Sequence, residues 1–366
     1  MIKQGNYEKL LEPGYIGKLR IKNRIIKVCG GAEDVGDANL YFMEAVARGG
    51  AGLITYGDVA PEVPLGITAP STKRHLEDDS LIPIFSKIAD GIHKNGSLVF
   101  MQLFHAGPQA WLKPGLQTIS SSALTQNEVK ELTAPQIPHQ MTIPEIHDMV
   151  EKFVSLAERA KKAGFDGVEI NGARMHLINS FLSRAWNKRQ DEYGYATMEN
   201  RARFMVEIIR ETKRRLGADY PISALINGIE LDIPNGITIE EAREFGRLLQ
   251  AAGADALHVR AFGYHGFGQI DLCEHSYYAP ETRKKLPKEL DWSRQGRGAL
   301  VPLAAAVKQV VTVPVIAVSR LDPELGEEIL EAGKADFIAI CRRIMADTEL
   351  PNKLAAGKPK DIRPCT

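Results

Sequence analysis

The sequence predicts a (β/α)8 TIM barrel, a fold of the α/β class, from three observations. Eight short apolar runs, each bounded by Gly, Pro, Asp or Asn, have the character of strands buried on both faces. Amphipathic helical stretches alternate with these runs, and several end in Gly before the next run, as in KKAGFDG and QAAGADA. No G-x-G-x-x-G turn follows an early strand, which argues against a doubly wound sheet.

The expected elements follow one another in regular order. Strands are expected at 25–29, 52–55, 97–103, 167–171, 222–226, 256–260, 315–318 and 337–340. Helices are expected at 38–48, 81–93, 143–163, 199–216, 239–252, 298–311 and 323–332, with a last one near 347–356. A hairpin at 14–20 is expected to close the bottom of the barrel. The segments 104–144 and 261–293 are longer than ordinary loops, and both follow strand C-termini, so we expect them to shape a pocket.

The composition excludes several classes of partner. The 366 residues are 44% hydrophobic and 25% charged, and 46 basic residues balance 46 acidic ones, so no polyanion such as a nucleic acid is indicated. No apolar run reaches the roughly 18 residues that span a bilayer. Four cysteines lie far apart and form no disulfide pattern, which favours the cytoplasm: Cys29, Cys273, Cys341 and Cys365. We therefore expect an enzyme acting on a small-molecule substrate, and homo-oligomer formation stays open.

Function in such a barrel is carried by residues at the C-terminal ends of the strands. Strands seven and eight are followed by Ser319, Arg320, Cys341 and Arg342, where barrels commonly bind phosphate. Small residues let backbone N–H groups approach phosphate oxygens, and an arginine adds charge-assisted hydrogen bonds. An arginine paired with a carboxylate on the barrel rim is the alternative interpretation.

One long motif is specific enough to indicate a family. Residues 167–208, GVEINGARMHLINSFLSRAWNKRQDEYGYATMENRARFMVEI, resemble the fingerprint of the old yellow enzyme family of NADH:flavin oxidoreductases. IGKLRIKNRI, ARGGAGLIT and VFMQLFHAG match the same family in register, and the resemblance covers essentially the whole chain. It implies a (β/α)8 barrel that holds FMN non-covalently, with NAD(P)H open as the electron donor.

The resemblance also implies which residues hold the cofactor. The isoalloxazine edge would be met by the backbone of strand one, by a glycine after strand two and by a glutamine ending strand three. The phosphate would lie on the ends of strands seven and eight, where Ser319 and Cys341 stand in place of the usual glycines. The implied FMN-binding residues are Val28, Cys29, Gly30, Gly57, Gln102, Ser319, Arg320, Cys341 and Arg342.

The substrate side departs from the family pattern. The usual His with His or Asn pair becomes Asn171 and Arg174, and the usual Tyr proton donor becomes His176. A fixed positive charge on Arg174 suits a carboxylate better than a neutral carbonyl, and histidine can exchange a proton near neutral pH. The strand-five position that normally supplies a cation to the flavin is Leu225. The negative charge of the reduced flavin therefore needs another cation nearby, such as Arg174 or His258.

The end of the chain resembles one branch of the family. DIRPC is similar to the start of the iron–sulfur segment in multidomain members such as 2,4-dienoyl-CoA reductase and trimethylamine dehydrogenase. We expect an FMN barrel over 1–358 and the beginning of that segment over 359–366. A 4Fe-4S cluster needs four thiolates, so we expect no metal in this chain and a cluster in a longer protein, with Cys365 as its first ligand.

The predicted function is an FMN-dependent oxidoreductase that exchanges hydride through flavin N5 with a small or CoA-linked substrate. His176, Arg174 and Asn171 are the expected catalytic residues. Two alternatives stay open. The first is a flavin-binding barrel that has a degenerate substrate site and serves partner domains. The second is an amine or N-methyl dehydrogenase.

Overall fold

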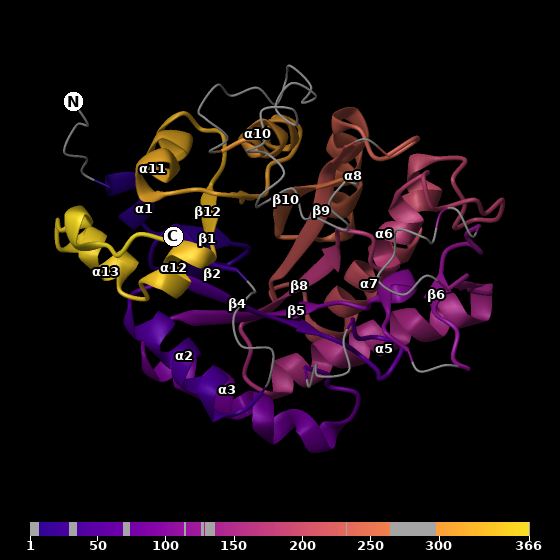
Figure 1. Ribbon diagram of the computed structural model, residues 1–366, viewed down its shortest axis with the longest axis horizontal. Coiled ribbons are helices and arrows are strands. Elements are labelled where there is room, and N and C mark those ends of the chain that lie inside the picture. The colour runs from indigo at the N-terminus through magenta and orange to yellow at the C-terminus, as the bar shows by residue number, and fades with distance from the viewer. Residues whose placement is uncertain are drawn as a thin grey trace.

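A closed barrel of eight parallel strands forms the centre of the computed structural model, as predicted (Figure 1). The structure describes residues 7–28, 35–68, 74–112, 115–125, 128, 136–231, 233–263 and 298–365. Each strand pairs with the next along the chain, and the last pairs with the first. The strands are β3 (Ile25–Lys27), β4 (Leu53–Val59), β5 (Leu98–Leu103), β8 (Gly167–Gly172), β9 (Ile222–Leu231), β10 (Ala256–Gly263), β11 (Val315–Ala317) and β12 (Phe337–Ile340).

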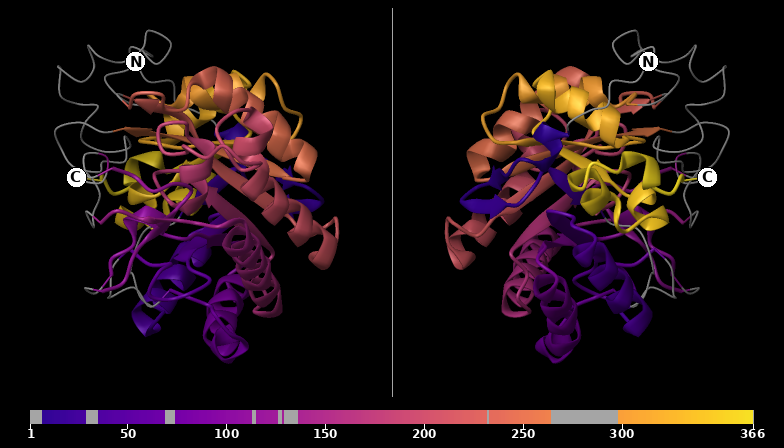
Figure 2. Two further views of the ribbon diagram at one scale, coloured as in Figure 1. Left: turned by 90° about the vertical axis from the view of Figure 1, so that its right-hand side faces the viewer. Right: turned by 90° about the vertical axis from the view of Figure 1, so that its left-hand side faces the viewer.

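Helices surround this barrel, as both side views show (Figure 2). The longer ones are α2 (Asp37–Arg48), α3 (Ile82–Lys94), α5 (Ile143–Lys162), α7 (Met198–Leu216), α8 (Ile239–Ala252), α10 (Val301–Lys308) and α11 (Pro323–Glu331). Thr142 and Thr238 begin α5 and α8 with capping boxes, in which each threonine exchanges hydrogen bonds with a glutamate three residues on. The helix expected at 298–311 begins only at Val301, with proline in its first turn.

The barrel has two apolar layers. Val168 and Ile170 of β8 point outward and join the large core under the helices. Inside the barrel, Ile26, Phe100 and Phe337 pack with the predicted hairpin, β1 (Gly14–Ile16) and β2 (Leu19–Ile21). The hairpin therefore closes the N-terminal end of the barrel, and the C-terminal end is left for function.

Several elements differ from the sequence expectation. β9 continues to Leu231, past the predicted end at 226, because β10 pairs with it over the same length. The long segment after β5 contains a two-stranded sheet, β6 (Ile119–Ser120) and β7 (His139–Gln140). Short helices α1 (Glu8–Leu11), α6 (Leu177–Leu182) and α12 (Arg342–Ala346) were not expected, and the last helix, α13, spans Leu350–Ala355. Most of the second long segment, from 264 on, lies outside the described residues.

The end of the described chain is tied to the barrel. Buried Asp347 accepts hydrogen bonds from Lys353 Nζ at 2.6 Å and from the Arg363 backbone N–H at 2.8 Å. Cys365 follows as an exposed free thiol, and the described residues hold no cluster of three or more potential metal ligands. Within the described residues, no helix has both the length and the apolar character needed to cross a membrane.

Candidate active site

Polar side chains line the inside of the barrel above the apolar layer. Gln102 Nε2 donates to Glu169 Oε1 at 2.7 Å, and Ser223 Oγ donates to Glu169 Oε2 at 3.1 Å. His258 Nδ1 lies 3.0 Å from the same Oε2 atom. Asn171 Nδ2 donates to Gln102 Oε1 at 3.1 Å. A hydrogen-bonded network therefore joins β5, β8, β9 and β10 across the barrel.

Glu169 is ionised within this network. Burial alone would raise the pKa of its carboxyl, but the charge of His258 and the hydrogen bonds from His258, Gln102 and Ser223 together lower it. Because the carboxylate can only accept, the proton between Glu169 and His258 resides on Nδ1 of the imidazole. The network thus sets the tautomer of His258.

The described residues expected at the flavin edge lie on adjacent strands. Gly57 of β4 approaches Gln102 of β5 so closely that a Cβ at Gly57 would lie 2.7 Å from the Gln102 Cβ. Val28 follows β3 and belongs to the apolar cluster inside the barrel. Cys29 and Gly30, which were expected beside Val28, lie outside the described residues.

The residues expected at the phosphate follow two neighbouring strands, β11 and β12. Ser319 has φ 93° and Arg320 has φ 46°, both in the left-handed region that favours glycine. Ser319 is also buried, which fits its place where the family has glycine. Cys341 and Arg342 begin the short helix α12. Small and cationic residues thus stand together at these strand ends.

The loop after β8 places Arg174 at the barrel mouth. Arg174 has φ 58°, and its backbone is held on both sides by Asn227 of β9: Oδ1 accepts from the Arg174 N–H at 3.0 Å, and Nδ2 donates to the Arg174 carbonyl at 3.1 Å. Asn171 Oδ1 accepts from the Ala173 N–H at 3.0 Å. The conformation of this loop is therefore imposed by side chains of β8 and β9.

A buried carboxylate supports the same loop from behind. Glu230 accepts from Asn179 Nδ2 at 2.8 Å, Asn227 Nδ2 at 3.1 Å and the Ile237 N–H at 3.0 Å, and from the Ser183 hydroxyl at 2.5 Å. Burial raises the pKa of Glu230, and these hydrogen bonds from neutral donors oppose the shift. Glu230 therefore joins α6, β9 and the Arg174 loop in one network.

His176 is buried beside this loop, with its ring edge-to-face on Phe104 at 5.0 Å between centroids. Neither ring nitrogen makes a hydrogen bond of ordinary geometry within the described part of the chain. Burial lowers the pKa of His176 well below its usual value, and the charges of Arg174 and Arg260 lower it further, against a small opposing effect of the Ala106 backbone. His176 is therefore neutral at pH 7.

Sequence reasoning missed Arg260 as a site residue. It follows His258 by two positions on β10, so both side chains point to the same side of the strand. This alternation of side chains along the strand is the sequence signal that could have identified Arg260. Leu225, by contrast, is where the family has a cation; it is buried and pairs with Asn171 on one side and His258 on the other.

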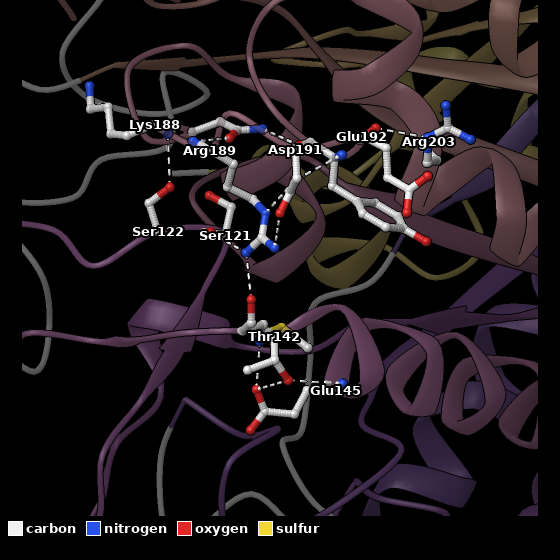
Figure 3. Close-up of polar contacts among 12 residues, drawn as sticks. Ser121, Ser122, Thr142, Glu145, Lys188, Arg189, Asp191, Glu192 and Arg203 are labelled. Carbon is white, nitrogen blue, oxygen red and sulfur yellow. Dashed lines mark hydrogen bonds and ion pairs between the residues drawn. The ribbon is translucent and has the colours of Figure 1, made fainter.

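The part of the sequence motif around Asn187, Arg189 and Asp191 stabilises the fold and does not take part in the reaction. Buried Arg189 donates to the Ser121 carbonyl at 3.0 Å and to the Met141 carbonyl at 2.5 Å, and it forms an ion pair with Asp191 at 2.6 Å (Figure 3). Asn187 donates to the carbonyls of Phe181 and Tyr193. These contacts fasten the long segment after β5 to the loop after β8.

A parallel barrel closed at one end, with polar and cationic strand ends at the other, defines a TIM barrel whose functional site lies at the C-terminal ends of its strands. The chain belongs to the NADH:flavin oxidoreductase / NADH oxidase family, whose sequence profile matches residues 9–361. FMN is therefore its cofactor, as predicted.

Several of its relatives are longer proteins. The chain is similar to an NADH oxidase of Thermoanaerobacter brockii (35% identity over 98% of this chain and 52% of the relative) and to a cinnamate reductase of Clostridium sporogenes (31% identity, 98% and 54%). Its fold is similar to that of 2-naphthoyl-CoA reductase, with a TM-score of 0.83, 26% identity, and coverage of 98% and 54%. The chain spans about half the length of these relatives, which agrees with the predicted multidomain branch.

The residues present fit FMN. The strand ends after β11 and β12 offer arginines and a glycine-like backbone for a phosphate, and Gln102 offers an amide that can both donate and accept. The buried Nε2 of His258 has no hydrogen-bond partner among the described residues, so the interior of the barrel contains a polar atom that a ligand or a water molecule can satisfy.

Proposed function

We propose that the chain is the catalytic barrel of an FMN-dependent oxidoreductase whose substrate is small or CoA-linked and bears a carboxylate. Bound FMN supplies hydride exchange at its N5 atom. The observation that carries the substrate class is the pair of arginines, Arg174 and Arg260, which both act on the electrostatic environment of His176. Two fixed positive charges at one mouth favour an anionic ligand.

Each catalytic residue has a distinct task in this proposal. Arg174 holds the carboxylate, in a backbone conformation set by Asn227. Asn171 holds the loop by accepting from the Ala173 N–H. Neutral His176 exchanges a proton with the substrate through a ring nitrogen that has no described partner. NAD(P)H is the proposed electron donor, and the cytoplasm the proposed compartment.

The names of relatives support this substrate class. Cinnamate carries a carboxylate, whereas a naphthoyl-CoA supports only the CoA-linked class, because its acyl group is a thioester. A histamine dehydrogenase from Rhizobium has the same fold, at a TM-score of 0.83 and 26% identity, which keeps amine oxidation as the second candidate. The two arginines disfavour a simple ammonium substrate because like charges repel.

Ligand titration of the flavin absorbance band tests the proposal, with cinnamate and the neutral cinnamamide as a matched pair. We expect the wild type to bind the carboxylate about tenfold or more tightly than the amide, and Arg174→Ala to lose this preference. Arg184→Ala removes an arginine that pairs with Glu241 and should keep the preference. An Arg174→Ala variant with undiminished preference would contradict the anchoring role, and tighter binding of a simple amine would favour the second candidate.

A further inference from the structure

A buried histidine that the proposed reaction does not use lies directly after β5. The side chain of His105 has no exposed surface, and burial lowers its pKa, so the ring is neutral at pH 7. Its Nδ1 atom accepts from the Gly107 N–H at 3.0 Å, so the proton of the ring is on Nε2, which donates to Glu62 Oε1 at 2.9 Å. Glu62 therefore fixes both the orientation and the tautomer of this ring.

The turn that contains His105, residues 104–107, packs on the loop after β8 next to His176. The His105 carbonyl accepts from the N–H of Leu177, the residue directly after His176, at 3.0 Å. Gly107 has φ 58°, and a Cβ at this position would lie only 2.7 Å from the N and Cα atoms of Leu177. The two backbones are therefore in direct contact, and the turn cannot shift toward the loop without displacing it.

The 104–107 turn also contacts the His176 ring itself. Phe104 packs on that ring edge-to-face, with 5.0 Å between centroids and 78° between the ring planes. The backbone of Ala106 lies near enough to oppose the lowering of the His176 pKa. Neither ring nitrogen of His176 has a hydrogen-bond partner among the described residues, so packing against the turn orients the ring.

The His105 ring connects this turn to a charged side chain. If Glu62 is truncated, the Nε2–H group of His105 loses its acceptor inside the protein, and the ring must move to find another. Because Nδ1 of the same ring is bonded to the Gly107 backbone, the turn moves with it. A change at Glu62 therefore reaches His176 through two contacts, the packing of Phe104 and the hydrogen bond to Leu177.

We infer that Glu62 is a positioning residue for proton exchange at His176, which it orients through His105 and the 104–107 turn. The inference rests on the proposed function, because it requires that His176 exchange a proton with the substrate. Glu62 and His105 neither touch the substrate nor transfer a proton in this arrangement. Their contribution is geometric, since a displacement of about 1 Å in a catalytic group can slow a reaction by about 100-fold.

A double-mutant cycle measured by stopped-flow tests this role. The FMN-loaded chain is reduced chemically without oxygen, and its reoxidation by cinnamate is followed through the flavin absorbance. We expect Glu62→Ala to slow this reaction by about tenfold in the wild-type background. In the His176→Phe background, where no imidazole remains to be positioned, it should slow the reaction by less than about twofold. A general loss of stability would act equally in both backgrounds.

Two further variants separate orientation from charge. Glu62→Gln keeps an oxygen that can accept from His105, so its rate should stay within about threefold of the wild type. Lys152→Met removes the ion pair at Glu62 Oε2, which measures 2.8 Å, but leaves the hydrogen bond to His105, and should also stay within about threefold. Because the Glu62 side chain is 18% exposed, its truncation should leave the chain folded and able to bind FMN, which circular dichroism and flavin titration check.

An NMR signal from His176 reports its position without any substrate. In the chain with labelled histidine, the His176 Cε1–H signal is the one missing from His176→Phe. We expect Glu62→Ala to shift this signal, because the Phe104 ring beside it makes the chemical shift sensitive to their relative position. Glu62→Gln should leave the signal in place.

Equal slowing by Glu62→Ala in both backgrounds, a wild-type rate in Glu62→Ala, or a His176 signal that does not move overturns the inference. A Glu62→Gln or Lys152→Met variant as slow as Glu62→Ala does so too, because charge rather than orientation would then be responsible. A wild type that cinnamate does not reoxidise, or a His176→Phe variant as fast as the wild type, would instead count against the proposed function.

Discussion

Arg174 owes its position to a residue that need not touch any ligand. Its backbone N–H and carbonyl are both bonded to Asn227, and the φ of 58° is one that an arginine adopts only when its surroundings impose it. Asn227 is itself held by Glu230. Carboxylate recognition therefore depends on a buried amide one strand away.

Asn227→Ala should reduce the carboxylate preference while leaving FMN affinity unchanged. It also leaves the Arg174 backbone and Glu230 short of buried partners, so we expect a loss of about 2–4 kcal/mol in the free energy of unfolding. Asn227→Asp keeps the shape but places a second carboxylate beside Glu230, and should be less stable still. Urea unfolding and ligand titration measure the two effects. A stable Asn227→Ala variant with the full carboxylate preference would show that the loop after β8 keeps its conformation without Asn227.

His176→Phe should slow the half-reaction that needs a proton by about 10–100-fold and leave FMN binding intact. Because the pKa of His176 lies well below its usual value, the wild-type step should not titrate with an ordinary histidine pKa between pH 6 and 8. Stopped-flow reduction and reoxidation across that range measure both. A rate equal to that of the wild type would favour the degenerate-site alternative.

Glu62, in the segment after β4, joins a second buried histidine to α5. His105 Nδ1 accepts from the Gly107 N–H at 3.0 Å, so Nε2 carries the proton and donates to Glu62 at 2.9 Å. Lys152 of α5 pairs with the other oxygen of Glu62 at 2.8 Å. Burial alone would raise the pKa of Glu62, but His105 and Lys152 outweigh it and lower the pKa to about 2.

This lowered pKa has a defined consequence for acid stability. The contribution of Glu62 is fully present above its unfolded pKa, near 4.5, and is lost as the pH falls toward 2. After allowance for solvent screening, it amounts to about 1–2 kcal/mol. Glu62→Gln should therefore be less stable than the wild type at pH 6, with a gap that narrows toward pH 2.5 in urea unfolding. A constant gap would mean that Glu62 is not charged in the folded protein.

Across the whole molecule, a few contacts hold distant segments of the chain together. Arg189 joins the loop after β8 to the segment after β5 through the Ser121 and Met141 carbonyls (Figure 3). At the other side of the barrel, the backbone N–H groups of Lys9 and Leu10 in α1 donate to Glu327 of α11, which joins the beginning of the chain to its last third.

Arg189→Lys should destabilise the protein by about 2–4 kcal/mol, because lysine cannot donate in three directions from a planar group and leaves buried carbonyls unpaired. Arg203→Lys is the matched control: Arg203 lies in the same motif and donates to the exposed Glu192 carbonyl at 2.8 Å, so its loss should cost less than about 1 kcal/mol. Thermal and urea unfolding compare the two. Equal losses in the free energy of unfolding of the two variants would show that the burial of Arg189 does not determine the cost of replacing it.

The sequence alone determined the barrel, because strands buried on both faces and amphipathic helices have local periodicities that need no knowledge of distant contacts. The hairpin that closes the bottom of the barrel was local in the same sense. Family membership and FMN followed from one contiguous motif. The expected site residues could be named because strand ends are themselves local features.

Only the tertiary structure decided how those residues are arranged. His258 and Glu169 are 89 positions apart, and nothing local predicts that they pair inside the barrel. The same holds for Asn227 of β9 on the Arg174 backbone and for the effect of the Arg260 charge on His176, because both join residues that are far apart in the sequence. Burial and distant charges set the protonation of His176 and Glu169. These are properties of an assembled interior, in which the dielectric environment of each group depends on residues far away in the chain.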